Sequence, residues 1–207
     1  RLCPHFHLPL QSGSDTVLKS MRRRYTADRY RRTVDQLYRS IPHASVTADL
    51  IVGFPGETEG DFRRTLLLVE EVGFDWGFVF KYSPRQGTAA AELASYPIEL
   101  IAERHAECLG LVDRIGLEHR LRLVGTVQQV LIEEADFGRT RGNYKMRVPG
   151  DFRPGETIEA RVLEWHILGR TADEFNVQGG FGGASLGHGH ELSGRFQTNY
   201  RRHAGAV

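Results

Sequence analysis

The stretch Ser45-Val-Thr-Ala-Asp-Leu-Ile-Val-Gly-Phe-Pro-Gly-Glu-Thr58 contains the pattern of a buried strand, a glycine-rich turn and the start of a helix. Along the strand, one side is purely aliphatic, whereas the other carries the carboxylate Asp49 near the carboxyl end. Parallel α/β proteins place ligands at this end of their strands, so Asp49 is a candidate binding residue. The turn Phe54-Pro-Gly-Glu57 would let backbone approach a bound molecule closely. We expect Thr58 to cap the next helix, with Asp61 beside its positive end.

Two further strands are predicted on either side of this stretch, at residues 5–11 and 76–82, because polar or aromatic side chains alternate there. Helical spacing fills the two intervals between the strands, with ends at Pro42 and Gly73. This order predicts a parallel α/β sheet with right-handed crossovers. Three strands cannot close a barrel, so we expect further structure to cover the sheet edge at the first strand. Lys81, on the third strand, is expected either to pair with Asp49 or to face a ligand.

The second half of the chain changes character. Pro97 opens a long helix with one apolar seam, and from about Leu123 short strands and turns replace helical spacing. Such a pattern predicts a small antiparallel barrel. In residues 143–148, Tyr144, Met146 and Val148 are expected to point inward. The polar side chains on the opposite side or in the adjacent loop, predicted at 137–142, are Arg139, Arg141, Asn143, Lys145 and Arg147.

Composition narrows the function classes. The 207 residues are 40% hydrophobic and carry a net charge of only +1, so a nucleic-acid site must rest on local clustering of charge. No apolar run is long enough to cross a bilayer, which predicts a cytoplasmic protein without membrane contact, and we expect a monomer. Cys3 and Cys108 have no metal-ligand spacing, and His5 and His7 lack a third ligand nearby, so no metal site is predicted.

Three motifs in a fixed order carry a family resemblance: His7-Leu-Pro-Leu-Gln-Ser-Gly-Ser-Asp15, Ile51-Val-Gly-Phe-Pro-Gly-Glu-Thr58 and Phe80-Lys-Tyr-Ser-Pro-Arg-Gln-Gly-Thr88. Together they resemble the radical S-adenosylmethionine (SAM) methylthiotransferases. The first and third look most like the MiaB-type enzymes, which methylthiolate N6-isopentenyladenosine beside the tRNA anticodon. The resemblance covers roughly residues 1–172.

The resemblance implies an enzyme of tRNA modification that uses SAM and two [4Fe-4S] clusters. The family's Cys-x3-Cys-x2-Cys cluster loop does not occur in this sequence. We therefore expect a carboxyl-terminal portion of such an enzyme, inactive by itself. Its expected parts are a partial radical SAM barrel at 1–96, a connecting helix at 97–122, an RNA-binding TRAM barrel (OB-like) at 123–172 and a disordered Gly/His-rich tail at 173–207.

Site residues follow from the matched motifs and from the strand pattern. The residues expected to bind the cofactor or the target base are Gln11, Ser12, Gly13, Ser14, Arg23, Asp49, Gly53, Glu57 and Lys81. Those expected to hold tRNA are Arg139, Arg141, Asn143, Lys145 and Arg147. No residue is assigned to the chemical step itself, since the cofactors carry that chemistry.

Three alternatives remain open at this stage. The target is instead threonylcarbamoyl-adenosine in tRNA, towards which Gly142-Asn-Tyr144 has some likeness, or an aspartate of a ribosomal protein. A second alternative is a non-catalytic RNA-binding module, because cluster ligands are missing from the sequence. The third is an unrelated α/β enzyme with an appended barrel.

Overall fold

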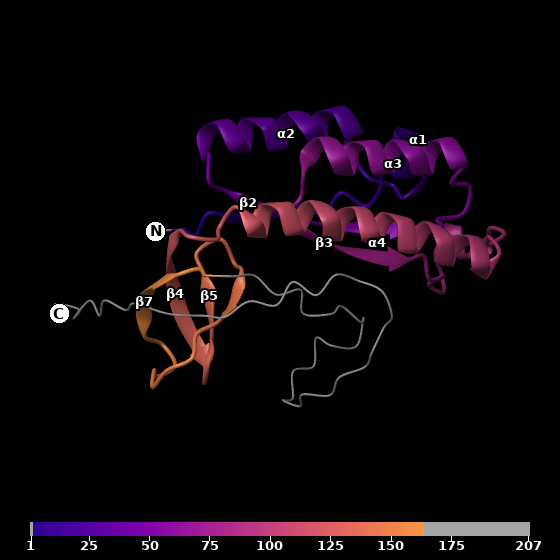
Figure 1. Ribbon diagram of the computed structural model, residues 1–207. Coiled ribbons are helices and arrows are strands. Elements are labelled where there is room, and N and C mark those ends of the chain that lie inside the picture. Colours follow the sequence, from indigo (N-terminus) through magenta and orange to yellow (C-terminus); the bar gives the residue numbers. More distant parts are fainter. Residues whose placement is uncertain (1, 164–207) are drawn as a thin grey trace.

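The computed structural model describes residues 2–163, which form a parallel α/β layer and a smaller antiparallel sheet (Figure 1). The tail predicted at 173–207 and the end of the region predicted at 123–172 lie outside the described residues.

The parallel sheet has the predicted strands and order. Strands β1 (His5–His7), β2 (Ser45–Val52) and β3 (Trp76–Lys81) lie in the order β1-β2-β3, and both pairings are parallel. The first strand, at residues 5–7, is shorter than the predicted 5–11. Beyond β1 the chain stays hydrogen-bonded to β2: the N–H groups of Leu8 and Leu10 donate to the Thr47 and Asp49 carbonyls, and Gln11 forms an isolated bridge to Leu50.

Helices cover one face of this sheet. Helices α2 (Ala27–Ser40), α3 (Glu59–Val72) and α4 (Ile98–Leu121) pack on that face, whereas α1 (Asp15–Ser20) and the short 3₁₀ helix η1 (Ala89–Glu92) lie in connections. The core beneath them contains Val46, Ala48, Leu50, Val52, Phe62, Val69, Phe74, Cys108 and Val112. None of the described helices is long and apolar enough to cross a membrane.

The helix ends follow the predicted capping chemistry in most places. Thr58 and Asp61 form a reciprocal capping box at α3, and Gly73 ends that helix with a φ of 64°. Thr26 caps α2 by accepting from the Arg29 N–H. Ser14 precedes α1 but its side chain does not cap it, because the hydroxyl donates to Asp61, and the carboxylate of Asp15 accepts from the Ala27 N–H.

The second sheet contains β4 (Val127–Glu134), β5 (Phe137–Thr140), β6 (Lys145–Arg147) and β7 (Thr157–Arg161), in the antiparallel order β6-β5-β4-β7. Within the described residues it is open, because its edge strands β6 and β7 do not pair, so the closed barrel is not seen there. Residues 137–140 form a strand where a turn was predicted; the turns lie at Asp136 and Asn143, whose φ angles are 62° and 66°. Tyr144, Met146 and Val148 are buried, as predicted.

Candidate functional site

Buried side chains fix the conformation of the glycine turn that follows β2. Gly53 has a φ of 74°, and its N–H donates to Oε2 of Glu57 at 2.9 Å. Glu57 is fully buried and forms an ion pair of 2.8 Å with Arg104 of α4, which also donates to the Glu57 carbonyl. Burial raises the pKa of Glu57, and the bonds from Gly53 and Arg104 oppose that rise. Glu57 therefore stabilises the turn from the protein interior, and its carboxylate does not face a ligand at the surface.

Arg104 is a site-shaping residue that sequence analysis missed. It is only 5% exposed and lies between the rings of Phe62 and Tyr96, with its guanidinium carbon 5.3 Å and 5.4 Å from the two ring centroids. The available signal was its position three residues after Ile101, on the apolar seam of the long helix.

The segment 11–14 packs against the start of α3. Ser14 donates to Asp61 at 2.6 Å, and the Gly13 N–H donates to the Thr65 hydroxyl at 2.9 Å. A Cβ on Gly13 would stand 2.6 Å from the Cα of Thr65, so only glycine fits. Ser12 also contacts the Thr65 hydroxyl, at 3.2 Å. These side chains build the fold, and any ligand contact from this segment would come from its backbone.

Gln11 lies at the carboxyl end of the sheet in a left-handed conformation, with a φ of 67°. Its N–H donates to the Asp49 carbonyl at 2.7 Å, and its own carbonyl accepts from the Ile51 N–H at 2.8 Å. A non-glycine residue held in this region is strained, and such positions cluster at functional sites.

The face of the sheet opposite the helices carries polar and aromatic side chains at its surface. The carboxylate of Asp49 lies 3.4 Å from Nε2 of His7, whose Nδ1 lies 3.0 Å from the Thr47 hydroxyl. On β3, Phe78 and Phe80 stack with centroids 6.1 Å apart, and Phe80 is 50% exposed. A carboxylate can bind a cationic group, and aromatic rings beside it can stack on a purine base.

The structure brings only some of the predicted cofactor residues together. His7, Gln11 and Asp49 meet around the ends of β1 and β2. Lys81 pairs in register with Val52, so it lies on the other face from Asp49, and the suggested Lys81–Asp49 ion pair is wrong. Arg23 is exposed in the connection between α1 and α2. Within residues 2–163, no group of His, Cys, Asp or Glu has the arrangement of a metal site.

The predicted RNA-binding residues share one surface of the second sheet. Arg139 and Lys145 pair across β5 and β6, and each is already neutralised, by Glu133 at 2.9 Å and by Glu134 at 3.0 Å. Two further members have no carboxylate partner among residues 2–163: Arg141 donates to oxygens of Leu2 and Gln129, and Arg147 is exposed. Asn143 accepts from Arg139 and lies 3.5 Å from His5.

A buried carboxylate joins the two sheets. Asp75 precedes β3, is 3% exposed, and accepts from the Val46 N–H at 2.6 Å and from the hydroxyl of Tyr144. Burial, together with the charge of Asp75 and the hydrogen bond to it, raises the pKa of Tyr144, so its hydroxyl stays protonated and donates. The ring of Tyr144 meets Trp76 edge-on at 5.5 Å, and Trp76 stacks on His5 at 5.2 Å. The loop between β5 and β6 is thereby fixed to the parallel sheet.

The parallel layer with its glycine turn was expected to belong to a radical SAM domain, and comparison with known families agrees. The family described as the Radical SAM superfamily matches residues 2–69.

Comparison with individual proteins narrows the class within this superfamily. The chain is 45% identical over 161 residues to tRNA-2-methylthio-N(6)-dimethylallyladenosine synthase 1 of Mycobacterium marinum, covering 77% of this chain and 30% of that protein. The synthase of Corynebacterium diphtheriae is 41% identical over 180 residues, or 79% and 35% of the two chains. That of Methylacidiphilum infernorum is 42% identical over 173 residues, or 79% and 37%. The chain is thus similar to the radical SAM methylthiotransferases over more than three quarters of its own length, and it spans about a third of the length of these curated relatives.

Proposed function

We propose that this chain is part of an enzyme that methylthiolates N6-isopentenyladenosine in tRNA. The observation that carries the proposal is the 40 to 45% identity to synthases named for this product, over more than three quarters of the chain. An enzyme that acts on tRNA is expected in the cytoplasm, and a monomer is the proposed state.

The polar end of the open sheet face has the donor set to hold part of SAM. The side chain of Asp49 is 28% exposed and offers a carboxylate to a cationic group, while the strained Gln11 backbone borders it. Phe78 and Phe80 supply flat surface beside this carboxylate. SAM bound with an iron–sulfur cluster supplies radical chemistry in this superfamily. The part played by these residues would be to bind and orient.

The described residues do not fit an iron–sulfur cluster. Of the two cysteines, Cys3 is exposed and Cys108 is fully buried in the core, and burial raises the pKa of the Cys108 thiol to about 12. A thiol with so high a pKa is a poor source of the thiolate that a cluster requires. We assign no cluster ligand and no catalytic step to this part of the chain.

The outer surface of the second sheet is proposed to hold tRNA, as the TRAM barrel of the family would. Its support is the group of cationic side chains on β5, on β6 and in the turn between them, of which Arg141 and Arg147 are the ones not bound to a carboxylate within the described residues. Non-specific phosphate contacts of this kind weaken steeply with salt.

The target nucleoside is tested by expressing the complete gene that contains the coding sequence of this chain, in a host lacking its own methylthiotransferases. Mass spectrometry of digested tRNA is expected to show 2-methylthio-N6-isopentenyladenosine, and Asp49→Asn is expected to lower its amount at least tenfold. Asp28→Asn, the same change at an exposed position of α2, serves as the matched control. A methylthio group on threonylcarbamoyl-adenosine alone would assign the enzyme to the sister activity, and no product would remove the proposal.

The RNA surface is tested separately by titrating this chain with tRNA. Arg141→Ala together with Arg147→Ala is expected to weaken binding about equally for different tRNA sequences and to reduce the salt slope by about two. Arg139→Ala, whose charge Glu133 already neutralises, is the control and should change the salt slope less. An unchanged slope in the double variant would reject this surface.

A further inference from the structure

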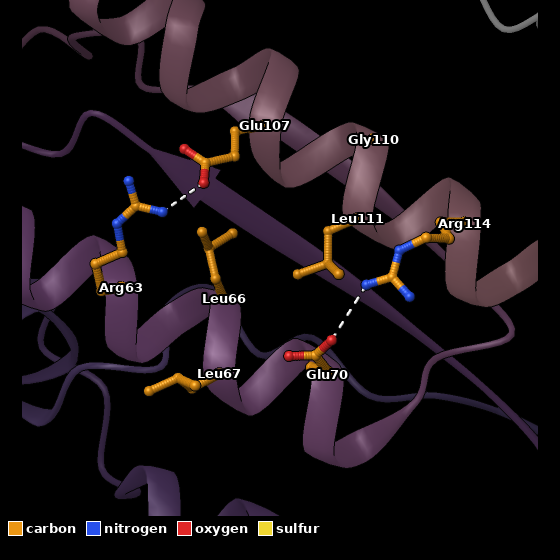
Figure 2. Close-up of a pocket in the computed structure, with 8 residues that line it drawn as sticks. All are labelled: Arg63, Leu66, Leu67, Glu70, Glu107, Gly110, Leu111 and Arg114. Atoms are coloured by element: carbon orange, nitrogen blue, oxygen red, sulfur yellow. Dashed lines mark hydrogen bonds and ion pairs between the residues drawn. The ribbon is translucent and has the colours of Figure 1, made fainter.

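In the groove of about 510 Å³ between α3 and α4, the charged side chains already pair with each other (Figure 2). Arg63 pairs with Glu107, and Arg114 pairs with Glu70, each pair crossing from one helix to the other. This charge pattern selects no particular ligand. The open face of the parallel sheet differs, because the hydrogen bonds of its histidines depend on where their protons lie.

Thr47 lies between two histidines on this open face. Its buried hydroxyl is 3.1 Å from Nε2 of His5 and 3.0 Å from Nδ1 of His7. The other ring nitrogen of His7, Nε2, lies 3.4 Å from the carboxylate of Asp49. At the other end, Nε2 of His5 lies 3.5 Å from the side-chain nitrogen of Asn143. These four contacts form a continuous relay from Asp49 to the loop beside the proposed RNA surface.

The hydroxyl proton of Thr47 cannot serve both histidines. A hydroxyl donates one hydrogen bond, and a neutral imidazole has one donor and one acceptor nitrogen. The carboxylate of Asp49 can only accept, so it favours the tautomer of His7 with the proton on Nε2. Nδ1 of His7 then accepts from Thr47. Thr47 must in turn accept from a protonated Nε2 of His5.

The other end of the relay favours the opposite direction. Arg139 donates to the side-chain oxygen of Asn143 at 3.2 Å, so the amide nitrogen of Asn143 faces His5. A donor at this place favours an unprotonated Nε2 on His5, which would then also accept from Thr47. Thr47 would accept from a protonated Nδ1 of His7. Both ends are satisfied together only when His7 carries a proton on each nitrogen, as the imidazolium.

The surroundings favour His7 over His5 as the ring that takes this proton. Burial first, and then the neighbouring His7, lower the pKa of His5. His7 is the more exposed ring, and it faces the carboxylate of Asp49. The other charged groups near the relay are Asp75 and Arg139, and β3 presents the uncharged rings of Trp76 and Phe78 on the same face.

We propose that His7 is a positioning residue for Asp49 and that its proton sets the direction of the whole relay. This inference rests on the proposed function, in which Asp49 binds a cationic group of SAM. Neutral His7 donates to the carboxylate and leaves its negative charge for that group. Charged His7 neutralises the carboxylate, the Thr47 hydroxyl turns to His5, and His5 exchanges its Nε2 proton for one on Nδ1 without changing its own charge. A cation at Asp49 and a second proton on His7 therefore weaken each other.

The tautomers are measured on this chain without any cofactor, so the result does not depend on what Asp49 binds. Long-range proton–nitrogen correlation spectra of histidine-labelled protein distinguish protonated from unprotonated ring nitrogens. The variants His5→Gln and His7→Gln assign the two rings among the nine histidines. His105 is the internal reference, because its Nε2 lies 2.8 Å from the Val79 carbonyl and must stay protonated throughout.

As the pH falls, His7 is expected to gain its second proton, and His5 to change from the Nε2–H to the Nδ1–H tautomer at the same midpoint. Asp49→Asn should move both midpoints together to lower pH, by about 0.5–1 pH unit, since the carboxylate no longer stabilises the charged ring. Thr47→Val should uncouple the two rings, whereas Thr47→Ser, which keeps the hydroxyl, should keep them coupled. Circular dichroism melting confirms that each variant is folded.

Three results would overturn the inference: unrelated midpoints for His5 and His7, a His5 tautomer that never changes, or midpoints that Asp49→Asn does not move. Coupling that survives in Thr47→Val would also overturn it, because the hydroxyl is the only link between the rings that the relay uses. The assay of the methylthiolated product with Asp49→Asn reports separately on the binding of SAM. A failure of the proposed function and a failure of the relay therefore give different results.

Discussion

At the scale of single residues, the ion pair of Glu57 and Arg104 matters most for the glycine turn. Both side chains are buried, and both contact the turn through Gly53 or the Glu57 carbonyl. Arg104→Met should lower the free energy of unfolding by about 3–5 kcal/mol, because it leaves a buried carboxylate without its partner. Arg63→Met, which removes an exposed pair, should cost less than about 1 kcal/mol. Urea denaturation compares the two, and similar losses would contradict the role of burial.

Restoring neutrality should recover part of that loss. In Glu57→Gln combined with Arg104→Met no charge stays buried, and the glutamine oxygen can still accept from the Gly53 N–H. A double variant as unstable as Arg104→Met alone would show that packing of the guanidinium, and not its charge, is the main contribution.

A second prediction at the scale of residues concerns the loss of stability at low pH. Burial alone would raise the pKa of Asp61, but hydrogen bonds from Ser14 and Thr58 and the charge of Arg64 outweigh it and hold that pKa below the ordinary 3.8. The unfolded chain therefore takes up the proton first, and the stabilisation by Asp61 is complete above pH 3.8 and is lost as the pH falls below it.

The variant Asp61→Asn tests the direction of this pH dependence. At pH 6 the variant should be about 0.5–2 kcal/mol less stable, because a helix cap is weakened. Between pH 6 and pH 3 its urea midpoint should fall less than that of the unaltered protein. Asp28→Asn, at an exposed first-turn position of α2, should leave the effect of acid on the midpoint closer to that of the unaltered protein. A larger fall of the urea midpoint in Asp61→Asn than in the unaltered protein would contradict the lowered pKa of Asp61.

At the scale of elements, α4 contains two glycines with opposite surroundings. A Cβ at Gly116 would stand 2.5 Å from the Asp75 carbonyl oxygen, whereas Gly110 faces open space. Gly116→Ala should destabilise the protein by about 1–3 kcal/mol, because backbone must move. Gly110→Ala should stabilise it by up to about 1 kcal/mol, because alanine favours helix. Thermal unfolding of both variants measures the difference, and equal shifts would mean that helix and strand are not in close contact at Gly116.

At the scale of the whole molecule, Asp75 and Tyr144 hold the two sheets together. Tyr144→Phe removes one donor from a buried carboxylate and should cost about 1.5–3 kcal/mol. Hydrogen exchange should rise in β5 and β6 more than in β1 and β2, and Trp76 fluorescence should change because its ring contacts Tyr144. Tyr25→Phe, whose hydroxyl donates to carbonyls of Pro9 and Leu10, is the control away from this junction. Uniform exchange across both sheets would mean that the hydroxyl does not serve the junction.

The sequence by itself determined the elements of the parallel layer, their order, the capping box at Thr58 and the family resemblance, because these depend on periodicity and on short motifs. Only the tertiary structure decided what each side chain meets. It placed Lys81 on the opposite face from Asp49, turned Ser14 towards Asp61, and buried Glu57 against Arg104, 47 positions along the chain. Alternation tells which residues share a face of one strand, but register and packing between distant segments fix their partners. For the same reason the role of Asp75 was not predicted: its partners are Val46 on β2 and Tyr144 in the loop between β5 and β6, far from it along the chain.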